Sequence, residues 1–318
     1  MQKPLMTPRA RPLPHGVENQ RLRAIGFMAL ATLCFAALDS TGKYLIVKLG
    51  VPVIEVSWLR FVGHIVFNAV ALWPLAFTPS LRSAKPMVQI FRSGLMVVTT
   101  GFNFLALRYL QLDQTITIFF LTPLLVAALA GPLLGEWVGW HRMLAIIAGF
   151  FGVLLVMHPG IGSVHWAMLI ALIATLGYAV YNIATRYLAA FDPATVTQTY
   201  TPLVGAIVLA APALAAWQWP ADGFETLLLA SLGFWGGLGH WFLILAHREA
   251  PAPVLAPFIY VGLIWMSALG FFVFGDVPTL WTLSGAAVVI VSGLYLLARE
   301  RKAVGAAKAG PASDIATQ

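Results

Sequence analysis

Residues 31–45 read ATLCFAALDSTGKYL, and residues 174–188 read ATLGYAVYNIATRYL. Ala, Thr, Leu, Ala, Tyr and Leu recur in step between the two stretches, at an offset of 143. Each stretch lies in an apolar run long enough to cross a bilayer, and the chain has ten such runs. A unit of five crossings is odd, so a second copy must enter the membrane from the opposite side. The repeat predicts two inverted five-helix units, the architecture of a secondary transporter with its substrate site between the copies.

The composition requires lipid as the main solvent of the chain. Of 318 residues, 60% are hydrophobic and only 10% are charged, whereas soluble domains average about 25% charged residues. Inside lipid every backbone N–H and C=O must be paired internally, and long apolar runs without strict alternation favour helices over a barrel. The fold class predicted is therefore all-α, with ten transmembrane helices.

Short connectors that carry Pro, Gly and charged residues separate the apolar runs. They divide the chain into a disordered cytoplasmic tail (1–21), a first five-helix repeat (22–158), a second five-helix repeat (159–300) and a second cytoplasmic tail (301–318). The expected spans are 23–44, 53–77, 88–109, 113–134, 139–158, 164–188, 194–217, 224–246, 251–274 and 278–298.

The net charge of +7 is distributed in the way that membrane insertion requires, and nucleic-acid binding is not indicated. With both termini inside, fifteen Lys and Arg fall on the inner side, with Arg92 counted in an inner connector. Only three, Lys43, Lys48 and Arg108, fall in outer connectors. This asymmetry predicts a bacterial-type inner-membrane protein with both termini in the cytoplasm.

Several short motifs recur in both halves and resemble one family. The chain is identified as a member of the drug/metabolite transporter superfamily, EamA-like branch. The resemblance spans about residues 22–300 and implies ten helices, two inverted repeats, a central cavity and alternating access. It implies no particular substrate and no direction of transport. The residues that carry it are Leu59–Phe61, Ala106–Tyr109, Thr122–Leu124, Gly135–Glu136, Gly149–Val153, Ala256–Tyr260, Phe274–Pro278 and Ser292–Tyr295.

Ionisable side chains inside the membrane are costly and mark candidate sites. Asp39 and Arg60 each lie roughly 9–10 Å below the outer end of their spans, so an antiparallel pair would place them side by side. They either form a structural ion pair or line a cavity, where the Arg60 fork could hold a carboxylate or phosphate. His64 shares a face with Arg60 and is either a packing residue or a proton relay. Glu55, near the start of its span, is expected to be solvated.

At the corresponding positions of the second repeat, neutral groups stand in place of these charges. Asn182 takes the place of Asp39, either lining the cavity or bonding between helices, and Tyr200 or Thr201 falls near the counterpart of Arg60. Asn103 and His240 occupy neighbouring positions of the aligned third spans. The predicted substrate-binding residues are Asp39, Arg60, Asn103, Asn182, Tyr200, His240, Trp241, Tyr260 and Trp265, the last two with core packing as the alternative. Proton coupling is assigned to Asp39 or His64.

Pro123 and Pro257 fall inside the fourth and ninth spans. A proline within a helix frees a carbonyl and bends the axis, so both residues are predicted to kink or gate the carrier. Catalytic and nucleotide-binding motifs are not found, and the His and acidic residues do not have metal-site spacing. We therefore expect no enzyme activity, no cofactor and no metal.

These features predict a carrier that moves a small organic metabolite by alternating access. An amino-acid-like or other amphipathic compound is the expected substrate. The expected partners are this substrate and the bilayer, and the protein is expected to be a monomer or homodimer. The alternatives are an intramembrane lipid-modifying enzyme, which would need a catalytic cluster at one interface, and a structural membrane subunit, which would not need internal acids and bases.

Overall fold

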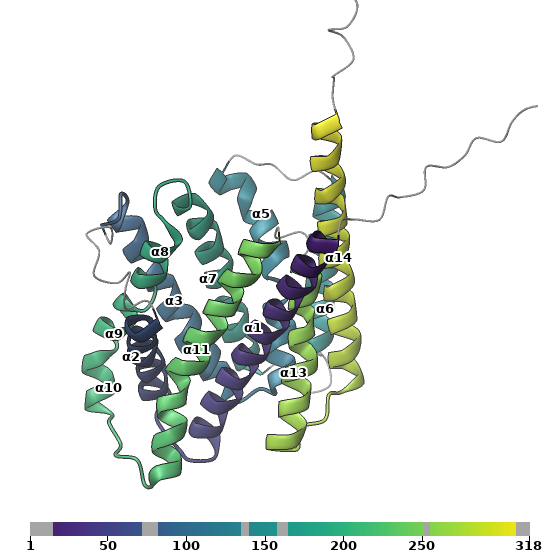
Figure 1. The fold of residues 1–318 in the computed structure, drawn as a ribbon. Helices are drawn as coiled ribbons and strands as arrows, with labels where there is room; N and C mark the ends of the chain where they lie inside the picture. The colour runs from purple at the N-terminus through teal and green to yellow at the C-terminus, as the bar shows by residue number, and fades with distance from the viewer. Residues whose placement is uncertain (1–14, 72–81, 135–139, 158–164, 251–254, 310–318) are drawn as a thin grey trace, which may run out of the picture.

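The computed structural model describes residues 15–71, 82–134, 140–157, 165–250 and 255–309, and the regular elements in these ranges are helical (Figure 1). The first half of the chain forms α1 (His15–Val47), α2 (Val53–Ala71), α3 (Pro86–Leu107), α4 (Leu112–Phe119), α5 (Thr122–Leu134) and α6 (Trp140–Met157). The second half forms α7 (Trp166–Leu188), α8 (Ala194–Tyr200), α9 (Leu203–Val208), α10 (Ala210–Ala215), α11 (Gly223–Glu249), η2 (Ala256–Tyr260), α13 (Val261–Leu269), η3 (Gly270–Phe274) and α14 (Leu280–Ala309).

The chain is a polytopic membrane protein. Six stretches of the described helices are long and apolar enough to cross a bilayer, and three shorter apolar helices accompany them. The expected span at 194–217 is divided into α8, α9 and α10. Pro202 and Pro212 explain this division, because a proline lacks the N–H that a continuous helix needs.

Two expected boundaries differ from the structure. Helix α1 begins at His15, so residues 15–21 are helical and do not belong to a disordered tail. Helix α14 continues to Ala309, well past the expected end of the second repeat. The remaining parts of both expected tails, residues 1–14 and 310–318, lie outside the described residues.

The largest helix contacts join the two halves of the chain. Helix α1 packs against α11, α3 against α7, α6 against α14, and α2 against α11. The helices of the two halves are therefore interleaved. The start of α1 and the end of α14 lie at the same end of the bundle (Figure 1), as an even number of crossings requires.

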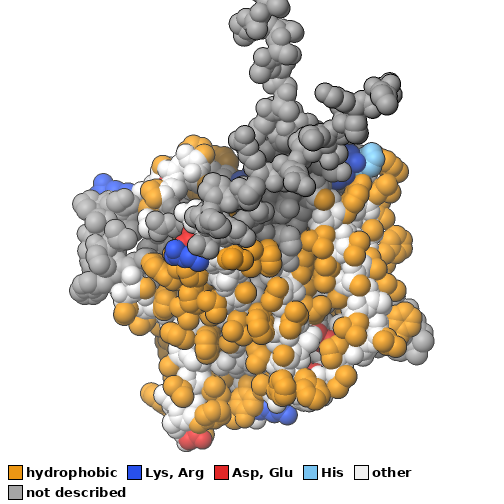
Figure 2. Space-filling model, turned by 45° about the vertical axis from the view of Figure 1, so that its right-hand side comes forward, with side chains coloured by type: hydrophobic (Ala, Val, Ile, Leu, Met, Phe, Trp, Pro, Cys, Tyr) orange, Lys and Arg blue, Asp and Glu red, His pale blue; other side chains and the backbone are white. Residues whose placement is uncertain are grey.

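The surface has the composition that lipid favours. On the face in Figure 2, hydrophobic side chains form a broad band, with Lys and Arg above and below it. Large apolar side chains such as Val70, Phe151 and Phe272 are more than half exposed. In a soluble protein so much exposed apolar surface would drive aggregation, whereas in a bilayer it faces acyl chains.

Helices α2 and α11 touch through two glycines. A Cβ added to Gly233 would lie 2.2 Å from the Gly63 Cα and carbonyl carbon, and one added to Gly63 would lie 2.8 Å from the Gly233 Cα. Only residues without a side chain permit this backbone approach. The contact fixes the α2–α11 distance directly beside Arg60 and His64.

Candidate functional site

Helix α3 carries two polar side chains that bind the two charged residues singled out in the sequence. Asn103 Nδ2 donates a hydrogen bond to Asp39 Oδ1 of α1 at 3.1 Å, and Arg60 of α2 donates one to Thr100 Oγ1. Residues three apart share a helix face, so α3 directs both partners into the same space. We call Asp39, Arg60, Thr100 and Asn103 the central polar cluster.

Asp39 and Arg60 come close without forming a direct ion pair. Within the described ranges, ion pairs shorter than 4.0 Å join Arg23 to Glu249 and Lys43 to Asp276, but not these two residues. Each of the two charges is held by a neutral side chain of α3 and remains partly exposed. The structural ion pair that would lock α1 to α2 is therefore not formed in this arrangement.

Two histidines from different halves meet beside this cluster. The rings of His64 in α2 and His240 in α11 are stacked, with centroids 5.4 Å apart and planes 10° from parallel. Gln198 Nε2 approaches His64 Nε2 at 3.0 Å, and the ring of Phe35 packs at a steep angle against His240. The tertiary contact of His240 is thus with His64, although the sequence alignment places His240 one residue from the position of Asn103.

The neutral counterparts in the second repeat behave differently from each other. Asn182 Nδ2 donates to the Tyr178 carbonyl at 2.7 Å within its own helix, which does not support its alternative role as a bond between helices. Tyr200 is partly exposed. Its neighbour Thr201 is buried and accepts a hydrogen bond from Arg92.

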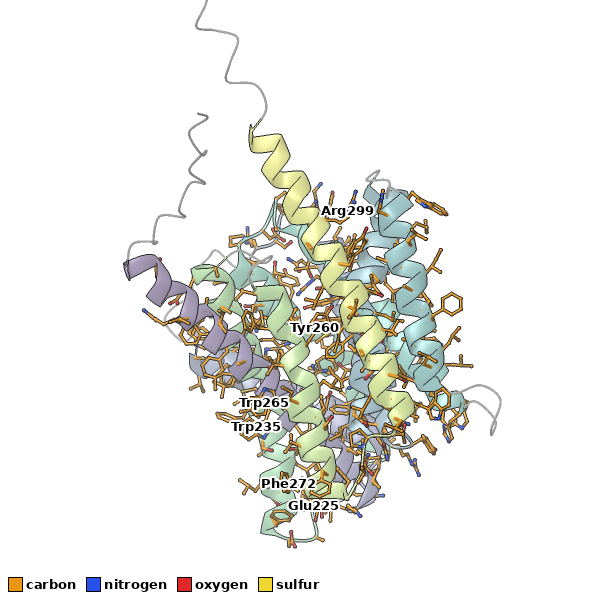
Figure 3. The ribbon with its side chains drawn as sticks, turned by 90° about the vertical axis from the view of Figure 1, so that its right-hand side faces the viewer. Glu225, Trp235, Tyr260, Trp265, Phe272 and Arg299 are labelled. Atoms are coloured by element: carbon orange, nitrogen blue, oxygen red, sulfur yellow. The ribbon has the colours of Figure 1, made fainter. Side chains whose placement is uncertain are left out.

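Three aromatic candidates lie at different positions. In Figure 3, Tyr260 and Trp265 sit between Arg299 at one end of the bundle and Glu225 at the other. Tyr260 is 9% exposed and packs edge-on against Phe120, with ring centroids 4.9 Å apart. Trp265 packs against the apolar core that α1 shares with α11. Trp241 is 36% exposed, so it contributes less to the interior than the other two.

Four residues singled out in the sequence share an unusual property in the structure. Each carries a buried polar atom with no hydrogen-bond partner among the described residues: Asn103 Oδ1, His240 Nε2, Tyr260 Oη and Trp265 Nε1. An unsatisfied buried polar group costs about 1–3 kcal/mol. Such groups therefore fit a site that a polar ligand or water completes.

Both predicted kink prolines lie at breaks in α-helical structure. Helix α4 ends at Phe119 and α5 begins at Thr122, directly before Pro123. Pro257 lies in the 3₁₀ turn η2, and the same span ends in the π-helical turn η3. Irregular turns at these places leave the fourth and ninth spans divided into segments.

Arg92 is a buried residue whose role sequence reasoning missed. It was counted in an inner connector, but it lies inside α3 and is 3% exposed. Its guanidinium donates to Thr185 Oγ1 at 2.7 Å, to Tyr181 Oη, to Thr201 Oγ1 at 3.1 Å and to the Thr197 carbonyl at 3.2 Å. The expected span 88–109 already contained position 92, so the apolar run itself was the available signal that Arg92 lies within the helix.

The connector between α7 and α8 is tied to the start of α3. Asp192 accepts hydrogen bonds from Ser83 Oγ, from the Ala84 N–H at 2.7 Å and from Gln89 Nε2 at 2.8 Å. Gln89 Nε2 also donates to Thr197 Oγ1. With the Arg92 contacts, these bonds form the inner polar network, which joins the two halves at the end where α1 begins and α14 ends.

The inner polar network makes an acid-stability prediction. Burial raises the pKa of Asp192, but the hydrogen bonds from Ser83, Gln89 and Ala84 outweigh burial and hold the pKa below its ordinary value. A lowered carboxylate pKa stabilises the fold above the unfolded value of about 3.9, and this stability is lost as pH falls through the folded value. The thermal stability of the detergent-solubilised protein should therefore fall more steeply below about pH 4 than that of the Asp192→Asn variant. Identical acid limbs would contradict this assignment.

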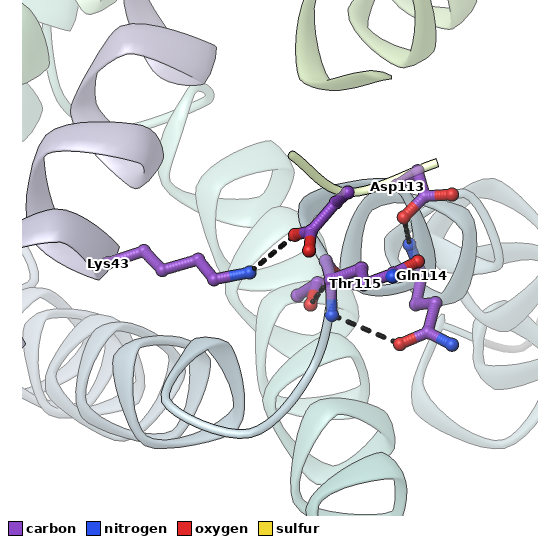
Figure 4. A network of polar contacts seen from close by, with 6 residues as sticks. Lys43, Asp113, Gln114 and Thr115 are labelled. Atoms are coloured by element: carbon purple, nitrogen blue, oxygen red, sulfur yellow. Dashed lines mark hydrogen bonds and ion pairs between the residues drawn. The ribbon is translucent and has the colours of Figure 1, made fainter. Parts of the chain in front are cut away.

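At the opposite end of the bundle, Lys43 and Asp276 join the two halves. Lys43 Nζ lies 2.9 Å from Asp276 Oδ2 and 4.6 Å from the centroid of the Phe274 ring. Asp113 and Gln114 belong to the same polar group (Figure 4). Lys43 was expected in an outer connector, but it lies in α1 and is 7% exposed.

Glu55 is also buried, in contrast to the expectation that it is solvated. It is 0% exposed, and its Oε2 accepts a hydrogen bond from the Gln218 N–H at 3.1 Å. This bond fastens the start of α2 to the connector between α10 and α11. The sequence placed Glu55 at the right end of the span but gave no sign that a distant connector covers it.

Within the described ranges, no group of three or more His, Cys, Asp or Glu residues could hold a metal ion. The polar side chains are spread over α1, α2, α3, α7 and α11. Their chemistry is that of recognition through guanidinium, carboxylate, amide and imidazole groups.

Comparisons with known proteins agree with this architecture. The model of the EamA-like transporter family matches residues 22–158. The S-adenosylmethionine uptake transporter of Rickettsia felis is 27% identical over 286 residues, covering 89% of this chain and 95% of the relative. The riboflavin transporter of Vibrio cholerae is 27% identical over 289 residues, covering 90% and 96%. One solved crystal structure shares the fold, with a TM-score of 0.61 at 19% identity, covering 90% of this chain and 99% of that one.

These relatives are transporters and not enzymes. They match nearly the full length of the chain, and the apolar helices match the multi-pass arrangement that such proteins need. Residues 22–158 of the chain match the EamA-like transporter family, and the relatives that cover the rest of the chain as well are transporters.

Proposed function

We propose that this protein is a secondary transporter that moves a small organic metabolite across the bacterial inner membrane by alternating access. The observation that carries the proposal is the central polar cluster, in which an acid and a base from neighbouring spans face one space without neutralising each other directly. The S-adenosylmethionine and riboflavin transporters among the relatives support a metabolite of that size. They also weigh against the lipid-modifying enzyme.

The proposed architecture is ten spans in two inverted repeats, residues 22–158 and 159–300. The pattern of helix contacts supports it. Exchanging the two repeats, so that α1 takes the place of α7 and α3 that of α11, turns the α1–α11 contact into the α7–α3 contact, and both are extensive. The same exchange maps the α6–α14 and α4–α13 contacts onto themselves. A two-fold axis in the membrane plane would produce this pattern.

The proposed substrate site lies between α1, α2, α3, α7 and α11. Asp39, Arg60, Asn103 and Asn182 are all partly exposed, although these spans pack on one another. Tyr178 stacks on Tyr181, with ring centroids 5.6 Å apart and planes 11° from parallel, and both rings lie near Arg60. Such an aromatic wall suits the ring systems of both relatives' substrates.

The two groups of contacts between the halves are proposed as the closures at either end. The inner polar network closes the cytoplasmic end, while Lys43–Asp276 and Glu55–Gln218 close the outer end. The breaks at Pro123 and Pro257 would supply the bending. Both termini are placed in the cytoplasm, and the protein acts as a monomer or homodimer.

Asp39 is the proposed proton-coupling residue. It is partly exposed and accepts a hydrogen bond from Asn103 within the central polar cluster. His64 remains the other candidate predicted from the sequence. It is 4% exposed and stacked on His240, and Arg60 lies nearby. Protonation of His64 would place a second positive charge close to that of Arg60, and the two charges would repel each other.

The function is tested by reconstitution into proteoliposomes that contain a trapped pH indicator. The substrate panel contains S-adenosylmethionine, riboflavin, amino acids, nucleosides and polyamines. We expect saturable uptake of at least one compound above that of protein-free liposomes, with a pH change inside if Asp39 couples protons. Asp39→Asn should abolish the pH signal, and any counterflow that remains should require a raised substrate concentration. Uptake indistinguishable from that of empty liposomes for the whole panel would contradict the carrier function.

A further inference from the structure

The charges in the central polar cluster are only partly satisfied. Among the described residues, Arg60 has Thr100 as its hydrogen-bond acceptor and no carboxylate within ion-pair distance. A guanidinium has five N–H donors, so most of the fork is available. Asp39 has one oxygen bonded to Asn103, which leaves its second oxygen available as well.

Asn103 adds an acceptor beside Asp39. Its amide nitrogen is used by Asp39, while its Oδ1 is buried with no partner among the described residues. Two oxygens, Asp39 Oδ2 and Asn103 Oδ1, are therefore available at one place. A group with several N–H donors and a positive charge, such as an ammonium, satisfies both together.

The spacing of the two subsites is set by α3. Thr100 and Asn103 are three residues apart, which is about 4.5 Å along a helix axis. The base held by Thr100 and the acid held by Asn103 are thus separated by roughly one turn. An α-amino acid carries its carboxylate and ammonium on one carbon, so its two ends can bind a base and an acid that lie close together without a direct ion pair between them.

We propose that the central polar cluster binds the zwitterionic head group of an α-amino acid, with the carboxylate on Arg60 and Thr100 and the ammonium on Asp39 and Asn103. The proposal rests on the transport function proposed above and specifies its substrate class. It separates the two kinds of relative. S-adenosylmethionine carries this head group, whereas riboflavin, which has neither an ammonium nor a carboxylate, does not.

The test uses matched ligands that differ only at the head. Binding to the purified protein in detergent is measured by ligand-induced thermal stabilisation and by competition. The panel holds S-adenosylmethionine, S-adenosylhomocysteine and the twenty amino acids, each binder then being compared with its decarboxylated amine and its deaminated acid. Methylthioadenosine and riboflavin serve as ligands without the head. We expect at least one amino-acid compound to bind, and either truncation to weaken it by about 30-fold or more.

Variants assign each end of the ligand to its residue. Arg60→Gln should weaken binding of the complete ligand about 30-fold and leave binding of the decarboxylated amine unchanged. Asp39→Asn should weaken binding of the complete ligand by a similar factor and leave binding of the deaminated acid unchanged. Arg60→Lys, which retains the charge, should keep part of the affinity and guards against misfolding of Arg60→Gln. Arg82→Gln, at an exposed position, is the control and should bind as the wild type does.

The outcomes separate this proposal from the transport function. If only ligands without the head group bind, or if Arg60→Gln weakens complete and decarboxylated ligands equally, the head-group assignment is overturned. Uptake of riboflavin or another headless compound in proteoliposomes would then still support a carrier. Absence of binding by every amino-acid compound likewise overturns the assignment, whereas absence of uptake across the whole substrate panel overturns the carrier itself.

Discussion

Replacing Arg92 with Lys is expected to lower the free energy of unfolding by about 3 kcal/mol, even though the substitution retains the charge. The Arg92 fork reaches side chains of α7, Tyr181 and Thr185, and also Thr201 and the Thr197 carbonyl beyond them in the chain. An ammonium is a single point of attachment and cannot reach all of them. The charge must still be buried, but with fewer hydrogen bonds to offset its desolvation.

Arg92→Leu should be no worse than Arg92→Lys, because it removes the buried charge together with its bonds. The main cost of Arg92→Leu is that the Tyr181 hydroxyl loses its guanidinium partner. Thermal unfolding and the monodisperse fraction in detergent measure both variants. Arg82→Leu, which removes a charge from an exposed position, is the matched control and should change stability by less than about 0.5 kcal/mol. A fully stable Arg92→Lys protein would show that the inner polar network does not hold the halves together.

Replacing Gly233 with Ala is expected to prevent normal packing of α2 on α11, at a cost above about 3 kcal/mol. The new methyl group would lie 2.2 Å from the Gly63 Cα and carbonyl carbon and 2.7 Å from its oxygen. These are backbone atoms, which cannot rotate away as a side chain can. The two helices must therefore separate, and Arg60 and His64 move with α2.

The measurement for Gly233→Ala is the yield of folded protein after extraction, followed by thermal unfolding. The control is Gly101→Ala in α3, where an added Cβ meets nothing within 4 Å. There the substitution should raise stability by about 0.5–1 kcal/mol, because alanine favours a helix more than glycine does. The two substitutions add the same methyl group, so opposite signs would isolate the effect of the close contact. Equal effects would show that the α2–α11 distance is not set by these glycines.

The proximity of Asp39 and Arg60 could be predicted because apolar runs and short connectors fix the position of each residue along its span. The sequence also selected Asn103, His240, Tyr260 and Trp265, all of which have buried polar atoms without partners. It could not reveal that Asn103 and Thr100 hold the two charges. Which face of α3 turns toward α1 and α2 depends on packing between segments distant in the chain.

The burial of Arg92, Lys43 and Glu55 was not predictable for the same reason. Each lies near the end of an apolar run. There the sequence around a water-exposed charged residue looks the same as the sequence around one that another segment covers. Arg92 is covered by residues more than eighty positions away, Lys43 by Asp276 and Glu55 by the connector at Gln218. A charged side chain near a span end is solvated by default, and only the tertiary fold removes it from water.

The sequence by itself determined that this protein is a membrane protein of helical spans, and it predicts an internal repeat. Lipid permits only structures whose backbone groups are paired internally, and the hydropathy of the chain shows directly that this constraint applies to it. The tertiary structure alone decided which polar groups meet. Contacts such as His64 with His240, or Asp39 with Asn103, join helices whose rotation is set by many packed side chains at once. No local pattern encodes that rotation, because it follows from the fit of whole helix faces.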